Sequence, residues 1–459
     1  MVRRVYLVWA GKGRDVTRGL SYDGTMRVAV LSAFALTAVA SFASGQPNEQ
    51  AKDSEQAKNS EQAKDSEPLG PLAVALPLEG LIFTPNAQYK LRYRHFEGRD
   101  LTENASLDFL RHRARIGAEL AYDGRVAVFV QLQDVRFFGD STVGSFFPGS
   151  TGLHQGYAQL SPFDGLAIRA GRQEIAYENQ RIIGNLDWLE EARAFDAIRF
   201  SFERGPVRVD SFYAKTFENL VLGPGAPIDD GDVVAGNLHV APLRELEVGF
   251  IGVIDRGGIA FPDRTLATFG GLLSGATAVG LSYSVEGYGQ IGSGRGELEQ
   301  RAYMAGLGIQ YRGDTVWKPF IAAFGEYLSG NEERSTTTLR TFEYPYPTGH
   351  AFHGEMDFFL DIPVDTDQRG LVDVGGTFGL SPFADFVIAP TYHWFASAVD
   401  RGDGRLTFGH EIDFKAAYRP WRFLSVDLVY GLFVPGEVWE HSRGTDLEHF
   451  AYSTLDVRF

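Results

Sequence analysis

The chain has 459 residues, with 43 Lys and Arg against 59 Asp and Glu, which gives a net charge of −16 at pH 7. This acidic balance argues against nucleic acid as a partner, and the absence of Cys excludes disulfides and thiolate-bound metals. No apolar run after residue 45 approaches the ~20 residues that a membrane-spanning helix needs, so a membrane-embedded form of this chain must be a β-barrel.

The N-terminus has the pattern of an export signal. Residues 28–42 (VAVLSAFALTAVASF) are apolar, follow Arg27 and precede the small residues Ala43, Ser44 and Gly45. This length matches the hydrophobic region of a signal peptide and is short for a membrane anchor, which is the alternative. We therefore predict a signal peptide region over residues 1–45, in which Met26 is an alternative start.

A polar repeat follows the signal: EQAKDS at 49–54, EQAKNS at 55–60 and EQAKDS at 61–66. A charge-balanced, low-complexity segment has no apolar surface to bury. We predict a disordered leader over residues 46–85, whose prolines mark an extended approach to the first strand.

From residue 86 onward, segments with period-two alternation recur and helical spacing is absent. Short connections such as Asp123-Gly124 alternate with long ones at 137–152, 174–194, 329–371 and 435–448, and a strand near 264–273 restores the alternation where it breaks. Short periplasmic turns, long extracellular loops and an even strand number are typical of bacterial outer-membrane barrels. The sequence therefore predicts an all-β protein, an antiparallel transmembrane β-barrel of about 18 strands over residues 86–459. The clear strands lie at 87–96, 107–122, 126–136, 153–160, 166–173, 195–202, 207–214, 233–240, 246–254, 279–290, 302–312, 320–328, 372–380, 386–396, 408–418, 423–433 and 449–459.

The last segment, 449–459, alternates and ends on Phe459. A terminal strand that finishes in Phe resembles the closing strand and assembly signal of bacterial outer-membrane barrels. We expect Phe459 to engage the barrel assembly machinery and the exterior to contact outer-membrane lipids. The alternative is an edge strand of a soluble sheet.

Charged side chains share one face of segment 107–122. Arg111, Arg113 and Arg115 alternate with mostly apolar neighbours, so they should stack about 7 Å apart on the lumenal side. An Arg cluster in a pore attracts anions, and the planar guanidinium binds both oxygens of a carboxylate. The alternative is that charges of both signs pair and fill the interior. The same alternation predicts that further polar and charged side chains face the lumen: Gln131, Gln133, Arg169, Arg199, Arg208, Asp210, Glu286, Gln290, Arg312, Asp373, His393, Glu411, Asp413, Lys415, Asp427, Asp456 and Arg458.

Three charged residues do not fit this pattern. Asp134, Arg136 and Arg172 fall out of phase with their strands. A β-bulge or a strand end must re-aim them toward the lumen, or the register differs there.

A series of short motifs is similar to the alginate export family of outer-membrane proteins. They occur in the family's order at 111–115 (RHRAR), 131–136 (QLQDVR), 153–157 (LHQGY), 171–173 (GRQ), 185–188 (NLDW), 195–196 (FD), 344–350 (YPYPTGH), 354–357 (GEMD), 369–373 (RGLVD), 392–393 (YH), 409–413 (GHEID) and 433–436 (FVPG). Together they cover residues 86–459, and the leader repeat lies outside them.

The resemblance implies an 18-stranded barrel that passes an anionic polysaccharide such as alginate through an Arg-rich pore. It also implies a passive channel, with periplasmic export proteins as possible partners. The implied pore residues are Arg111, Arg113, Arg115, Arg136, Arg169, Arg172 and Arg181, and their implied counter-charges are Asp134, Glu174, Asp187 and Asp196. Members of this family need not carry alginate, so a general porin for small anions remains the alternative.

Other function classes find little support in the sequence. No Ser–His set occurs in a nucleophile-elbow motif and no zinc motif occurs, so we predict no enzyme, no cofactor and no metal site. His350 and His353 could bind a metal, but two His three residues apart are common by chance. A structural or adhesive barrel without transport is the remaining alternative.

Overall fold

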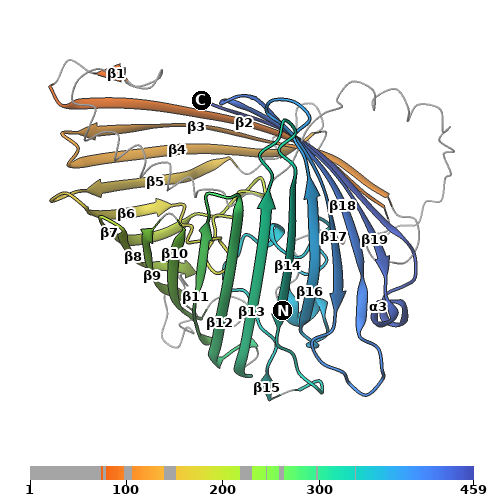
Figure 1. The fold of residues 1–459 in the computed structure, drawn as a ribbon. Coiled ribbons are helices and arrows are strands. Elements are labelled where there is room, and N and C mark those ends of the chain that lie inside the picture. Colours follow the sequence, from red (N-terminus) through yellow and green to blue (C-terminus); the bar gives the residue numbers. More distant parts are fainter. Residues whose placement is uncertain are drawn as a thin grey trace, which may run out of the picture.

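The protein is almost entirely β-structure in a computed structural model that describes residues 74–75, 79–97, 106–138, 151–217, 230–243, 245–257, 263–295, 298–335 and 337–459. Its strands form one sheet of 20, in which β1 (Val74–Ala75) and β15 (Thr338–Leu339) have only two residues each. The other 18 strands form a closed antiparallel barrel, because β20 (Glu448–Arg458) pairs with β2 (Leu81–Glu97) (Figure 1). The prediction of an 18-stranded barrel is confirmed.

The remaining barrel strands follow one another in chain order. They are β3 (Ser106–Tyr122), β4 (Val126–Phe137), β5 (Gly152–Leu160), β6 (Leu166–Gln173), β7 (Phe195–Arg204), β8 (Val207–Phe217), β9 (Gly231–Leu243), β10 (Leu246–Arg256), β11 (Thr265–Ala276), β12 (Leu281–Ser293), β13 (Glu299–Arg312), β14 (Phe320–Leu328), β16 (Leu371–Gly379), β17 (Phe386–Ala396), β18 (Thr407–Trp421) and β19 (Leu424–Pro435). The expected signal peptide and the hexapeptide repeats lie outside the described residues. Among the residues that are described, no helix has the length and apolar character needed to cross a bilayer.

The pleat of each strand separates an apolar outside from a polar inside. On β4, Val126, Val128, Val130 and Leu132 are each between 45% and 50% exposed, whereas Gln133 between them and the strand end is buried. Successive side chains of a strand point to opposite faces, so the exposed aliphatic row forms the surface that meets lipid.

The first barrel strand begins at Leu81, inside the range expected for the leader. The sequence suggested a later start because its prolines, the last of them Pro85, are typical of an extended approach to the strand. A proline lacks the N–H that a strand flanked on both sides needs. Pairing of β2 with β20 begins only at Gln88, although Pro85 lies opposite Ala118 of β3. Pro85 therefore lies where one edge of β2 extends beyond β20, and its missing donor breaks no ladder there.

Two long connections fold into the barrel, where Figure 1 shows them as yellow-green and cyan loops. We call residues 174–194, between β6 and β7, the first inner loop. Residues 329–370, between β14 and β16, form the second inner loop, which carries β15, η2 (Gly349–Ala351) and α2 (Ile362–Asp365). Two of the long loops that the sequence predicts as extracellular, 174–194 and 329–371, thus line the interior.

The two inner loops bind each other through their backbones. Ile183 and Tyr346 form a parallel β-bridge, in which Gly184 N donates to Tyr346 O at 2.8 Å. Thr348 N donates to Gln180 O at 3.0 Å. These bonds satisfy backbone groups of both loops inside the barrel, where an unpaired group is costly.

Aromatic packing explains why the second inner loop turns inward. Phe359 stacks on Trp439 of α3 (Glu437–Ser442), with ring centroids 4.9 Å apart, and it also contacts Phe395 of β17 at 4.6 Å. Phe358 packs on Phe433 of β19 at 4.4 Å. All five side chains are at most 5% exposed, and burying side chains of this size stabilises each by about 1.5–3 kcal/mol.

Candidate functional site

Two neighbouring strands carry basic side chains on their inward faces. In the register of β2 and β3, Lys90 lies opposite Arg113, and Arg92 lies opposite Arg111. Arg94 and Arg115 extend the two rows in the same phase. We call these six residues the basic array: Lys90, Arg92, Arg94, Arg111, Arg113 and Arg115.

The first inner loop places carboxylates against the basic array. Arg113 Nη2 donates to Asp187 Oδ1 at 2.6 Å, and Lys90 Nζ donates to the Asp187 carbonyl at 2.8 Å. Glu190, whose side chain is 0% exposed, accepts from Arg92 at 3.0 Å and Arg94 at 3.1 Å. Its second oxygen lies 3.1 Å from Arg111 Nη1. These five contacts hold residues 187–190 against β2 and β3.

Arg115 connects the array to the start of the same loop. Its Nη1 lies 3.2 Å from Glu174 Oε1, and its Nε donates to Gln133 at 2.7 Å. Glu174 also accepts from Asn185 at 2.9 Å and contacts His154 at 2.5 Å. The array therefore holds both ends of the loop segment 174–190.

Trp188 extends this contact to the second inner loop. The Arg92 guanidinium carbon lies 3.8 Å from the indole centroid, which is cation–π distance. On its other side the indole stacks on His350, with centroids 3.3 Å apart. An aromatic and cationic stack thus links the β2 wall to both inner loops.

The basic array keeps the loop carboxylates ionised. Burial raises the pKa of Asp187, but Lys90, Arg113, Arg458 and Arg115 outweigh burial, so this pKa lies well below its ordinary value. Burial likewise raises the pKa of Glu190, and Arg92, Arg94 and Arg111 bring it below the ordinary value. These two groups therefore favour the attached loop most strongly where both are charged.

The first inner loop should stay attached as the pH falls from about 8 to about 5. The folded pKa values of Asp187 and Glu190 lie below their unfolded values of about 4, so their contribution is complete above pH 4 and is lost only at lower pH. Because the chain has no native Cys, a spin label on Leu189→Cys reports loop mobility alone. We expect an immobilised spectrum throughout this range and a mobile one only below about pH 4. A mobile label at pH 6 would contradict this account.

Arg181 lies on the opposite side of the barrel from the array. It is 1% exposed, and its Nε donates to Glu286 of β12 at 2.9 Å. Its Nη1 donates to Glu326 of β14 at 3.0 Å and to the Tyr344 hydroxyl at 2.9 Å. Arg181 therefore fastens the first inner loop to the far wall, so this loop spans the lumen from β3 to β14.

Arg169 lies on the inward face of β6, apart from the array. Its guanidinium donates to Gln159 at 2.7 Å and lies 4.1 Å from the centroid of the Tyr157 ring. The structure therefore places Arg169 inside the barrel, as its phase predicts, beside polar and aromatic neighbours rather than loop carboxylates.

Four of the residues expected in the lumen lie on the outer face, which corrects their predicted placement. Arg136 pairs with Asp134 at 2.7 Å, and Arg172 pairs with Asp196 at 2.8 Å. No re-aiming occurs because Asp134 and Arg136 keep the phase of exposed Leu132, and because Arg172 lies directly opposite Asp196 in the β6–β7 register. Each outward charge is instead neutralised by its neighbour.

Half of the basic array was not predicted from the sequence. Lys90, Arg92 and Arg94 alternate within 87–96 just as the three Arg of β3 do, so the signal was present. Glu190 and Trp188 had no such signal, because residues of a loop follow no strand phase.

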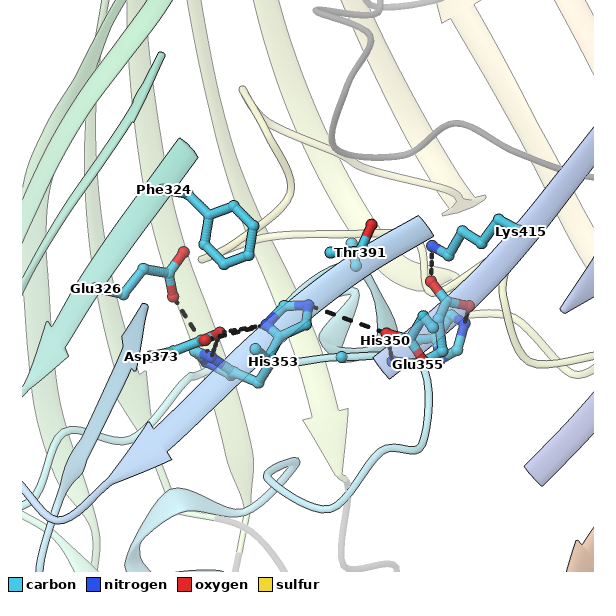
Figure 2. Close-up of a pocket in the computed structure, with 12 residues that line it drawn as sticks. Phe324, Glu326, His350, His353, Glu355, Asp373, Thr391 and Lys415 are labelled. Carbon is cyan, nitrogen blue, oxygen red and sulfur yellow. Dashed lines mark hydrogen bonds and ion pairs between the residues drawn. The ribbon is translucent and has the colours of Figure 1, made fainter. Parts of the chain in front are cut away.

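Acidic and imidazole groups gather along the wall formed by β14 to β18. Figure 2 shows a small cavity between the second inner loop and strands β14 to β18, toward which Glu326, His353, Asp373 and Lys415 point. His350 lies in the same region, bonded to Glu355 at 2.9 Å and to Asp357 at 2.8 Å. The interior therefore has a mainly basic wall on β2 and β3 and a wall on β14 to β18 that is richer in carboxylate and imidazole groups.

Comparisons with known proteins agree with this architecture. The family model described as "Alginate export" matches residues 82–217 and 255–452. No curated protein matches the sequence. Among solved structures, OccK8 (OprE) of Pseudomonas aeruginosa is 10% identical, with a TM-score of 0.56 over 82% of this chain and 98% of that chain. OccAB1 of Acinetobacter baumannii is 11% identical, with a TM-score of 0.57 over 82% and 96% of the two chains. OccD3 (OpdP) of Pseudomonas aeruginosa is 12% identical, with a TM-score of 0.55 over 84% and 93%.

Proposed function

Because the chain belongs to the alginate export family and has the barrel of an outer-membrane channel of the Gram-negative type, we propose that it passes anionic solutes along the basic array. The proposed substrate is an acidic polysaccharide such as alginate, or a related acidic sugar. Passage is passive, since a barrel has no energy source of its own. Its direction follows the gradient or a periplasmic export partner.

Unused donor groups in the array carry this proposal. Six cations face four carboxylates there: Glu174, Asp187, Glu190 and Glu191. The Nε–H groups of Arg94, Arg111 and Arg113 are buried and have no acceptor within the protein. A buried donor without an acceptor favours an incoming one, and carboxylates bind guanidinium groups strongly.

The spacing of the array suits a repeating anion. Successive inward residues of one strand lie about 7 Å apart, and neighbouring strands lie about 4.8 Å apart. A polymer with one carboxylate per sugar can therefore exchange contacts from one cation to the next, which keeps each binding step weak enough to leave.

Conductance of the full chain in planar bilayers tests the proposal. Under a KCl gradient, the sign of the reversal potential should show that Cl⁻ permeates better than K⁺. Oligouronates should block the current at concentrations at which neutral glucose oligomers of equal length do not. Block by monomeric uronate alone would instead make this a general porin for small anions. Cation preference, or no current, would overturn the proposal.

A further inference from the structure

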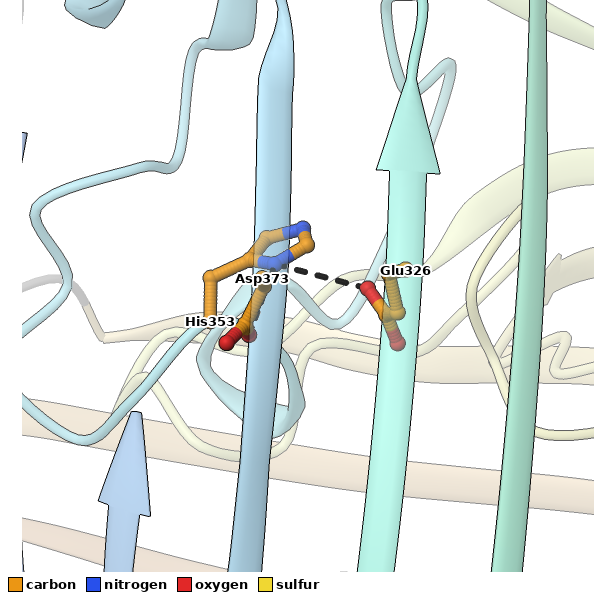
Figure 3. A group of neighbouring side chains, drawn as sticks. All are labelled: Glu326, His353 and Asp373. Atoms are coloured by element: carbon orange, nitrogen blue, oxygen red, sulfur yellow. Dashed lines mark ion pairs between the residues drawn. The ribbon is translucent and has the colours of Figure 1, made fainter. Parts of the chain in front are cut away.

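We propose that Glu326, His353 and Asp373 bind a divalent transition-metal ion, and that this ion fastens the second inner loop to the barrel wall. Glu326 belongs to β14 and Asp373 to β16, and the register pairs them directly. His353 comes from the second inner loop and points between them (Figure 3). The sequence analysis predicted no metal site, because the three ligands come together only in the folded barrel.

The distances between the three side chains match a metal tripod. His353 Nδ1 lies 3.4 Å from Glu326 Oε2 and 3.5 Å from Asp373 Oδ2, and one donor atom of each residue lies within 4.8 Å of the others. Bonds of about 2.0–2.2 Å to a tetrahedral ion separate the ligand atoms by about 3.3–3.6 Å. The same separations are too long for good hydrogen bonds.

An unpaired nitrogen points into this tripod. His353 is 3% exposed, and its Nδ1 makes no hydrogen bond within the protein. Its Nε2 lies 2.9 Å from the Tyr344 hydroxyl. The Tyr344 oxygen has two lone pairs, so it can accept from both Arg181 and the Nε2–H. That tautomer leaves the Nδ1 lone pair free to bind a metal.

Neighbouring groups hold the carboxylates of Glu326 and Asp373 in position. In metal sites, hydrogen-bond partners behind the ligands orient them in the same way. Arg181 donates to Glu326, and His393 Nδ1 lies 3.0 Å from Asp373 Oδ1. All three proposed ligands are at most 7% exposed. Such supporting contacts fix the ligands before the ion arrives.

The charge around the site also favours a cation. Arg181 pairs with both Glu286 and Glu326, and Lys415 pairs with Glu355. Two further buried carboxylates face imidazoles: Asp373 lies beside His353 and His393, and Asp413 lies 4.0 Å from His393. Buried charges in proteins are paired or coordinate metals. An imidazole among the ligands favours Zn²⁺ and related ions over Mg²⁺ and Ca²⁺, which prefer oxygen alone.

Metal binding to the untagged full chain, treated with chelator and folded into detergent micelles, tests this proposal. Equilibrium dialysis against Zn²⁺ should give one tightly bound ion per chain, and Ca²⁺ should not compete. His353→Gln should weaken binding by more than the roughly 10–100-fold typical of outer-shell changes. Tyr344→Phe should weaken it by about 10-fold. His410→Gln is the matched control, because His410 contacts Tyr392 away from the tripod, and it should bind as the wild type does.

A second measurement keeps the test decisive if His353→Gln does not fold. Gel mobility without heating reports whether each variant forms the barrel. Zinc-edge X-ray absorption of the wild type should show oxygen and nitrogen ligands with the outer-ring scattering of one imidazole. Scattering from two or more imidazoles, or equal Zn²⁺ binding by a folded His353→Gln variant, would overturn the proposal. Loss of anion preference would leave this result unaffected, so the two proposals fail separately.

Discussion

Replacing Arg111, Arg113 and Arg115 together with Ser should lower the anion-to-cation permeability ratio by on the order of tenfold. A unit charge about 7 Å from a permeating ion contributes ~0.6 kcal/mol in water, so three charges contribute more than the ~1.4 kcal/mol that corresponds to a factor of 10. Salt screens such interactions over about 8 Å at physiological ionic strength. The reversal potential should therefore be measured in dilute KCl, where the difference from the wild type is largest.

The outward arginines supply the matched control for this experiment. Arg136 and Arg172 pair with carboxylates on the outer face of the barrel. Replacing both with Ser removes two positive charges from the same part of the chain without altering the interior. Permeability ratios should then stay at the wild-type value. Equal effects of the inner and outer replacements would remove the basic array from the mechanism.

Glu190→Gln should lower the free energy of unfolding by about 3 kcal/mol or more. The Glu190 carboxylate is fully buried and contacts Arg92, Arg94 and Arg111. Removing its charge leaves three guanidinium groups close together without their shared counter-ion, and an uncompensated buried charge is the costly case. Urea titration of the protein in lipid vesicles measures the change.

The adjacent glutamate separates charge from burial. Glu191 also pairs with Arg111, but its side chain is 48% exposed. Ion pairs open to solvent contribute about 0–1 kcal/mol, so Glu191→Gln should be nearly neutral. If both variants lost the same stability, the attachment of the first inner loop would not depend on the buried Glu190 contacts.

The barrel could be predicted from the sequence because the alternation that defines each strand is visible among neighbouring residues of the chain. Side chains of a strand alternate between lipid and interior, so Arg111, Arg113 and Arg115 could be assigned to one face from their spacing alone. The same rule fixed the outward phase of Asp134 and Arg136. Motif order suggested that these two act in the lumen, but the pleat of β4 places them outside.

The paths of the two inner loops and their contacts inside the barrel could not be predicted in the same way. Arg181 reaches Tyr344 across 163 positions of the chain, and Glu190 meets Arg92 across 98. No periodic pattern encodes such contacts, because each loop adopts its path only after the walls exist. Of the three proposed ligands, only Asp373 was predicted to face inward; Glu326 was missed, and the position of His353 between them depends on the loop path.

The backbone bridge between Ile183 and Tyr346 makes the two inner loops mechanically dependent. The first inner loop is held on β2 and β3, and the second inner loop connects β14 to β16. Neither can swing aside while its partner remains in place, because the bridge and the Trp188–His350 stack would break first. We therefore expect the passage to widen only when both loops move together.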